Sequence, residues 1–179
     1  MKFLLTLLCL WPVAGWAVNV DICYNYDCAV HAKVLLTSTQ MRNVRELFID
    51  VSTPQQERDA ISLSIGMLEA YAAEQTPTGN DKGGNVADNG VDGRMDCIDH
   101  SHNTTAYLQL LKRFGFLAYH DVLEPVERAP MLVNVHWAGQ IVELSSGRKF
   151  AVDSWFRDNG APAVIYPLQD WLSGASPDE

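Results

Sequence analysis

The chain has 179 residues, and its 22 acidic residues outnumber its 13 basic ones, which gives a net charge of −9 with neutral histidines. A chain of this length is long enough to form one domain with its own hydrophobic core. Its negative charge repels phosphate backbones and anionic lipid head groups, and no block of Lys or Arg opposes that charge. We therefore expect neither nucleic acid nor a peripheral membrane surface to be a partner.

The first 17 residues have the pattern of a secretory signal peptide. Lys2 is followed by the apolar run FLLTLLCLW and then by small residues that end at Ala17. A membrane-spanning helix needs about 20 apolar residues, and Pro12 and the polar residues after Val18 cut this stretch short. We expect a single mature domain over 18–179, without an integral membrane segment, in the periplasm or outside the cell.

The cysteine count points to one free thiol. Three of the four cysteines would remain after cleavage of the leader, and in an oxidising compartment an odd number leaves one unpaired. Cys23 and Cys28 enclose the short segment YNYD, so they can close a disulfide loop and leave Cys97 free. Two other interpretations of Cys97 are a small buried hydrophobic residue and a metal ligand acting with His100 and His102. Its many ionisable neighbours argue against the first, and the lack of a second cysteine at ligand spacing argues against the second.

The first predicted helix covers 52–75. Thr53 can cap it, Pro54 suits its first turn, and Gln56 can complete a capping box. Apolar residues recur at helical spacing along this segment and predict a buried stripe, formed by Ile61, Ile65, Leu68 and Ala72.

The segment 76–92 has the composition of a loop, because it is rich in Gly, Asn and Asp. We interpret it as a flexible, solvated loop beside a cleft. Calcium binding through Asp81, Asp88 and Asp92 is the alternative, although their spacing matches no EF-hand loop.

A second helix is predicted to begin at Cys97 and to end before Gly115, which suits the left-handed residue after a helix. An apolar face including Tyr107 and Leu111 supports it. At the start of a helix, the positive end of the macrodipole favours a thiolate over a thiol. The free backbone N–H groups of the first turn can also serve as an oxyanion hole.

The remaining segments predict strands, at 116–119, 131–135, 140–144 and 149–152, and the last three form an antiparallel meander. An edge strand over 164–166 and a short helix over 168–172 complete the chain.

His136 ends one predicted strand and Asp153 follows another, so both side chains can reach the same end of the sheet, facing the helix that begins at Cys97. A cysteine, a histidine base and an aspartate that orients the histidine are the groups needed for nucleophilic attack on an amide. A histidine at a strand end and an aspartate in a turn are often structural, but their joint occurrence with an unpaired cysteine favours catalysis. Trp137 and Trp155, beside the two partners, can wall a substrate cleft, and we expect one of them to be core.

Two segments resemble the transglutaminase-like superfamily. RMDCIDHSHNTTAYLQLLKRFG is similar to its nucleophile helix, and HWAGQIVELSSGRKFAVDSWF is similar to its paired strands, with the catalytic His opening the first and the catalytic Asp closing the second. The resemblance implies a papain-like α+β fold, with helices packed on an antiparallel sheet, and Cys-His-Asp acyl chemistry through a thioester. Bacterial members carry an acidic residue after the nucleophile that helps to bind calcium, whereas Ile98 stands there in this chain. Calcium therefore has only weak support, and the proposed chemistry itself requires no cofactor.

The function expected from the sequence is that of an exported cysteine hydrolase or peptidase. Its substrate would be a peptide or isopeptide amide in a protein or peptide, including peptides of peptidoglycan. Hydrolysis is favoured over cross-linking because the chain has no room for the additional β domains of eukaryotic transglutaminases. One alternative is a cell-wall peptidase of the NlpC/P60 type, whose third polar residue is usually His, Asn or Gln and not an Asp such as Asp153. The other is a non-catalytic module that binds a peptide on the same fold.

Overall fold

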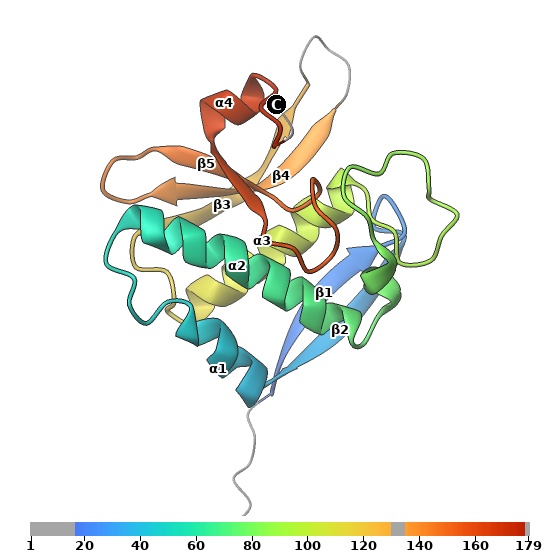
Figure 1. Ribbon diagram of the computed structural model, residues 1–179, viewed down its shortest axis with the longest axis horizontal. Coiled ribbons are helices and arrows are strands. Elements are labelled where there is room, and N and C mark those ends of the chain that lie inside the picture. The colour runs from blue at the N-terminus through green and yellow to red at the C-terminus, as the bar shows by residue number, and fades with distance from the viewer. Residues whose placement is uncertain (1–16, 130–134, 178–179) are drawn as a thin grey trace, which may run out of the picture.

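The computed structural model describes residues 17–129 and 135–177 (Figure 1). The predicted leader, apart from Ala17, and most of the predicted strand at 131–135 lie outside these residues. The described part is α+β, with helices packed against antiparallel sheets, as predicted at that level. No helix in it is both long and apolar enough to span a bilayer.

The N-terminal part is an antiparallel hairpin that the sequence analysis missed. Strand β1 (Ala17–Tyr24) pairs with β2 (Val30–Thr37), and helix α1 (Ser38–Glu46) follows directly. Val20 and Ile22 are buried while Asn19 and Asp21 are exposed, which is the alternation expected of a half-buried strand.

Helix α2 (Pro54–Ala73) agrees with its prediction. Its predicted apolar stripe, from Ile61 to Ala72, is fully buried. Thr53 caps the helix by accepting from the Gln56 N–H, but the Gln56 side chain accepts from the N–H of Ser52, so the predicted capping box does not close on Thr53. A short 3₁₀ helix, η1 (Pro77–Asn80), follows it.

Helix α3 (Cys97–Arg113) begins at the predicted cysteine. Asp96 caps it, and Gly115 ends it with a φ of 69°, in the left-handed region expected there. The helix lies between the β1–β2 hairpin and the four-stranded sheet and packs on both (Figure 1). Gly139 permits this packing, because a Cβ atom there would lie 2.8 Å from Cγ2 of Thr104.

The second sheet is an antiparallel meander with the order β3-β4-β5-β6. Its strands are β3 (His120–Arg128), β4 (His136–Glu143), β5 (Lys149–Asp153) and β6 (Val164–Pro167), and helix α4 (Leu168–Leu172) follows β6. The predicted edge strand and terminal helix are therefore confirmed.

Two strand predictions need correction. The segment 116–119 is not a strand, because the N–H groups of Ala118 and Tyr119 donate to the buried carboxylate of Glu57, and the strand begins only at His120. His136 begins β4 and does not end a strand. Because β4 and β5 run antiparallel, the start of β4 and the end of β5 still lie at the same end of the sheet.

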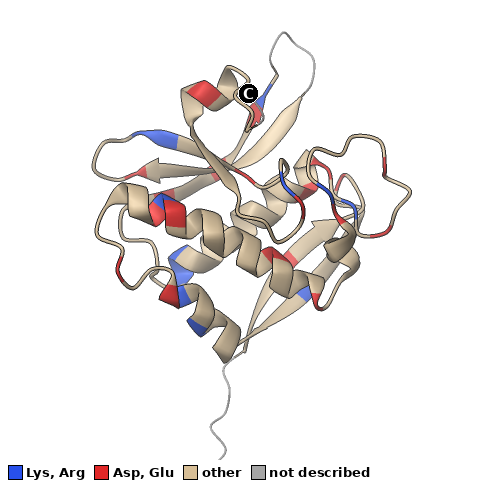
Figure 2. Ribbon diagram, in the orientation of Figure 1, with Lys and Arg blue, Asp and Glu red and all other residues tan. Residues whose placement is uncertain are grey.

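The charged residues are spread over helices, strands and loops, and neither sign gathers on a single element (Figure 2). A basic stripe, which would be the electrostatic footprint of nucleic-acid binding, is not visible among the described elements.

Candidate active site

Cys97 and His136 line one cavity of about 500 Å³. Cys97 comes from the first turn of α3 and His136 from the first residue of β4. Asp153, the last residue of β5, lies behind His136 and is only 1% exposed. The other lining residues include Tyr26, Asn85, Val86, Asp96, Arg128, Val135, Trp155 and Gly174.

The imidazole of His136 is held in one orientation. Its Nε2 lies 2.7 Å from Oδ2 of Asp153, which leaves Nδ1 as the ring nitrogen for a second partner. Aromatic rings surround it, with centroids 4.8 Å away for Trp155, 5.6 Å for Phe156 and 5.7 Å for Trp171. A histidine oriented by a carboxylate is the arrangement that a general base requires.

The carboxylate of Asp153 is itself fixed by two further donors. The indole Nε1 of Trp171 donates to Oδ2 at 2.9 Å, and the backbone N–H of Trp155 donates to Oδ1 at 3.2 Å. Trp171 was not predicted from the sequence, because its 18-residue separation from Asp153 crosses a loop and a strand and no local pattern marks it.

The surroundings of His136 raise the pKa of its imidazole. Burial by itself would lower its pKa, but the hydrogen bond and negative charge of Asp153 and the interaction with the Cys97 side chain raise the pKa to about 9. The imidazolium is the form of the ring that can give a proton to a leaving amine.

Cys97 keeps a free thiol, because the predicted disulfide between Cys23 and Cys28 is present. Its Sγ lies 4.0 Å from the carbonyl oxygen of Val135, the residue before His136. This contact places the sulfur beside the start of β4.

The disulfide loop is anchored to the start of α3. The N–H groups of Tyr26 and Cys28 donate to the two carboxylate oxygens of Asp99, at 2.8 and 2.7 Å, and that of Asp27 donates to Asp96 at 3.0 Å. Asp99 also accepts from the N–H of Asp96, which completes a capping box. The loop therefore helps to fix the turn that carries Cys97.

The first turn of α3 has fewer free backbone N–H groups for an oxyanion hole than the sequence predicts. The N–H groups of Ile98 and Asp99 both donate to Oδ1 of Asp96 at 3.0 Å. Among these first-turn donors, the N–H of Cys97 is the one without a partner in the described residues, and it is the donor nearest the sulfur.

The structure turns His100 away from Cys97. Its Nδ1 lies 2.8 Å from Oγ of Ser154, and its Nε2 lies 2.9 Å from Oδ2 of Asp81. His100 is only 1% exposed. Burial by itself would lower its pKa, but Asp81 and Glu69 raise it. His100 is thus part of an internal ion network.

The alternative metal interpretations gain no support from the geometry. Asp81 is buried against His100, while Asp88 accepts from the hydroxyl of Tyr26. In the described residues, the single cluster of three potential metal ligands is formed by Cys23, Cys28 and His102, and its two sulfurs are already bonded to each other. The segment 76–92 is also not a wholly solvated loop, because Asp81 is 1% exposed.

The two tryptophans predicted to bind substrate have different positions. Trp155 lines the cavity and packs on the ring of His136. Trp137 follows His136 in β4, and because side chains alternate along a strand it lies on the opposite face of the sheet. It is not among the lining residues of the cavity.

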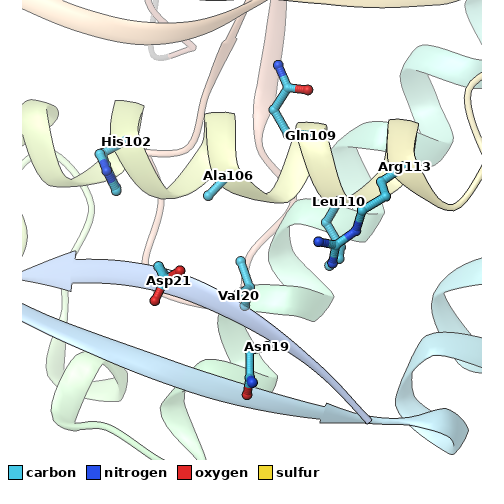
Figure 3. Close-up of a pocket in the computed structure, with 8 residues that line it drawn as sticks. All are labelled: Asn19, Val20, Asp21, His102, Ala106, Gln109, Leu110 and Arg113. Atoms are coloured by element: carbon cyan, nitrogen blue, oxygen red, sulfur yellow. The ribbon is translucent and has the colours of Figure 1, made fainter. Parts of the chain in front are cut away.

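A second hollow, of about 380 Å³, lies between β1 and α3 (Figure 3). The side chains of His102 and Arg113 come from the helix, and Asp21 comes from the strand. None of the eight lining residues in Figure 3 is a cysteine or a serine, so the chemistry expected of this chain belongs to the cavity at Cys97.

In comparisons with models of protein families, with curated proteins and with solved structures, none of the three gave a match to this chain.

Proposed function

We propose that this protein is a cysteine hydrolase that cleaves a peptide or isopeptide amide through a thioester at Cys97. The observation that carries the proposal is the 2.7 Å hydrogen bond between His136 and Asp153 at a cavity that Cys97 also lines. The resemblance of both segments to the transglutaminase-like superfamily supports a papain-like arrangement, in which a helix brings the cysteine to a sheet that holds the histidine and the aspartate. The disulfide is compatible with an exported protein.

The reaction follows from these positions. The sulfur of Cys97 attacks the carbonyl carbon of the substrate amide. The oxyanion that forms accepts a hydrogen bond from the backbone N–H of Cys97. The imidazolium of His136 gives its proton to the nitrogen of the leaving amine as the C–N bond breaks, which leaves a thioester and a neutral imidazole. The imidazole then takes a proton from water as the water oxygen attacks the thioester, and the acid leaves as the sulfur is released. Asp153 keeps the imidazole oriented throughout.

The surroundings of His136 favour this chemistry over a passive role. Its ring is enclosed by three aromatic side chains, which limits the access of water and strengthens the charge interactions within the site. An Asp as third residue supports the transglutaminase-like type over the NlpC/P60 type. Both types act through the same acyl-enzyme, whereas a peptide-binding module would form none.

An activated ester tests the proposal without knowledge of the substrate. The chain is incubated with p-nitrophenyl acetate near pH 7, and its intact mass and the released nitrophenol are followed over time. We expect rapid acetylation at Cys97, followed by hydrolysis that restores the original mass. Cys97→Ala should remove the acetyl adduct and His136→Ala should slow both its formation and its decay. Acetylation no faster than that of a small free thiol would favour the peptide-binding module.

A further inference from the structure

Arg128 is the basic residue at the mouth of the Cys97 cavity. It ends β3 and is the cross-strand partner of His136, so both side chains lie on the same face of the sheet. The Cβ atoms of such partners are about 5 Å apart. A guanidinium group therefore stands beside the imidazole of the candidate active site.

The guanidinium is held in a fixed position. Its Nη1 donates to the carbonyl oxygens of Trp171, at 2.6 Å, and Ala175, at 3.1 Å. Its Cζ lies 4.7 Å from the ring centroid of Trp171 and 5.8 Å from that of Phe156. Both rings also pack on His136, so one aromatic cluster positions the two cations.

Arg128 lacks the anionic partner that comparable arginines have. Arg58 pairs with Glu143 at 2.8 Å and Arg94 pairs with Asp88 at 2.9 Å, and all four of these side chains are largely buried. Arg128 is also partly buried. Burial lowers its pKa and the charge of Asp153 acts in the opposite direction, but within the described residues no carboxylate forms an ion pair with Arg128. Its Nε and Nη2 donate to no described residue, so they are open to a ligand.

Asp96 is the one acidic residue among the described residues that line the cavity, and it does not pair with Arg128. Oδ1 of Asp96 accepts from the N–H groups of Ile98 and Asp99, and Oδ2 accepts from that of Asp27. Both carboxylate oxygens of Asp96 therefore already accept hydrogen bonds from backbone N–H groups of the protein. Among the described lining residues, the cavity therefore has a guanidinium with free donors and no carboxylate that accepts from them.

We propose that Arg128 binds a carboxylate of the substrate, so that the peptide cleaved at Cys97 carries an acidic group next to the scissile amide. The proposal rests on the proposed function of this cavity. The carboxylate can belong to an acidic side chain or to the free C-terminus of a peptide. Paired N–H donors of arginine match the two oxygens of either carboxylate.

Matched alkylating reagents test the proposal and separate the two sources. Iodoacetyl-glycine carries a main-chain carboxylate, and iodoacetyl-glycinamide is its neutral counterpart. Iodoacetyl-aspartate amide carries a side-chain carboxylate, and iodoacetyl-asparagine amide is its neutral counterpart. The quantity compared is the ratio of the labelling rates of Cys97 by the anionic and the neutral member of each pair, which cancels any change in the reactivity of the sulfur itself.

We expect the wild-type ratio to favour the anionic member of at least one pair by about tenfold. Arg128→Gln should bring that ratio near one, and Arg128→Lys should keep only part of the preference because an ammonium lacks the paired donors. Arg148→Gln is the control, since it removes the same charge from the turn between β4 and β5, at the opposite end of the sheet from His136.

Three outcomes overturn the proposal. They are a wild-type ratio near one for both pairs, a preference that survives in Arg128→Gln, and an equal loss in Arg148→Gln, which would mean that the general field of the protein is responsible. Should Arg128→Gln fail to fold by circular dichroism, an unchanged ratio in Arg128→Lys would count against it. Failure of the proposed function looks different, because every reagent, including the neutral ones, would then label Cys97 slowly and independently of His136.

Discussion

Two groups of side chains in this molecule have the same chemical order, a nucleophile, a histidine and an aspartate. In one, Cys97 shares a cavity with His136, which lies 2.7 Å from Asp153. In the other, Ser154 lies 2.8 Å from His100, which lies 2.9 Å from Asp81. Both histidines therefore lie within hydrogen-bond distance of an aspartate.

Access separates the two sets. Ser154, His100 and Asp81 are 2%, 1% and 1% exposed, and none of them lines the cavity at Cys97. This buried network joins α3, the end of β5 and the segment after η1, so its role is structural. Hydrogen-bond geometry alone therefore does not identify an active site, and an open cavity beside the nucleophile has to accompany it.

The largest difference between the two sets should appear when each nucleophile is removed. Cys97→Ser should abolish labelling by iodoacetamide and change the free energy of unfolding by less than about 1 kcal/mol, because Cys97 is partly exposed. Ser154→Ala should leave labelling in place and lower the free energy of unfolding by about 1–3 kcal/mol, because it removes the hydroxyl that partners Nδ1 of the buried His100. Intact mass and urea denaturation measure the two effects. Reaction of folded Cys97→Ser with a fluorophosphonate at Ser154 would contradict the comparison.

The aspartates can be compared by the same chemical change. Asp81→Asn should lower the free energy of unfolding by about 3 kcal/mol, because it removes the charge partner of the buried His100, and it should leave the labelling rate of Cys97 within about twofold. Asp153→Asn should also destabilise the fold, but it should slow labelling at pH 6 by about tenfold or more, because His136 loses the carboxylate that keeps it protonated. Equal effects of both variants on labelling would show that the two networks act as one.

The disulfide loop allows a test of how the first set is positioned. Cys23→Ala combined with Cys28→Ala should lower the free energy of unfolding by about 2 kcal/mol, since the closed loop is short. Labelling of Cys97 should slow by several-fold, because the loop N–H groups that hold Asp99 at the start of α3 become mobile. A labelling rate equal to that of the wild type would mean that the Asp96 cap alone fixes the turn.

The smallest effect concerns the donor behind Asp153. Trp171→Phe keeps an aromatic ring beside His136 but removes the N–H that donates to Asp153, so labelling at pH 6 should slow by about fivefold, or about 1 kcal/mol. Trp137→Phe is the matched control and should leave the rate unchanged, because Trp137 lies on the other face of β4. A rate unaffected by Trp171→Phe would show that His136 and the backbone N–H of Trp155 suffice to hold the carboxylate in place.

The elements set by local signals were predicted well. Helix α2 begins at Pro54 after its Thr53 cap, and α3 lies between the Asp96 cap and Gly115. Cys97, His136 and Asp153 could be selected because each is the first or last residue of a helix or strand. The periodic pattern of apolar residues begins or stops there, and this marks the position in the sequence.

The elements that depend on tertiary contacts were missed. Strand β3 contains Pro125 and several charged residues, and its pairing with β4 shifts register between Leu123 and Val126, so it shows no regular alternation. Its start is set by Glu57, more than 60 residues earlier in the chain. In β1 the alternation of Val20 and Ile22 with polar residues was present but was overlooked beside the apolar leader.

The site details without a sequence signal are those made by distant partners. Trp171 and Arg128 join the cavity of Cys97 through the packing of α4 and β3, and nothing in their local sequence distinguishes them from other core or surface residues. His100 was considered as a metal ligand together with Cys97 because it is close in sequence, but the helix turns it toward Asp81.

The most direct test of the central claim is the pH dependence of the alkylation of Cys97 by limiting iodoacetamide, followed by intact mass between pH 5 and 10. With the pKa of His136 raised to about 9, the imidazolium persists from acid pH through neutrality and is lost only as the pH rises through about 9. The wild type should therefore label at pH 6 nearly as fast as at pH 8. His136→Ala should label at pH 6 about 100-fold more slowly than at pH 8.5, as an ordinary thiol does. A wild-type profile that follows an ordinary thiol, and that His136→Ala does not change, would contradict an activated cysteine at this site.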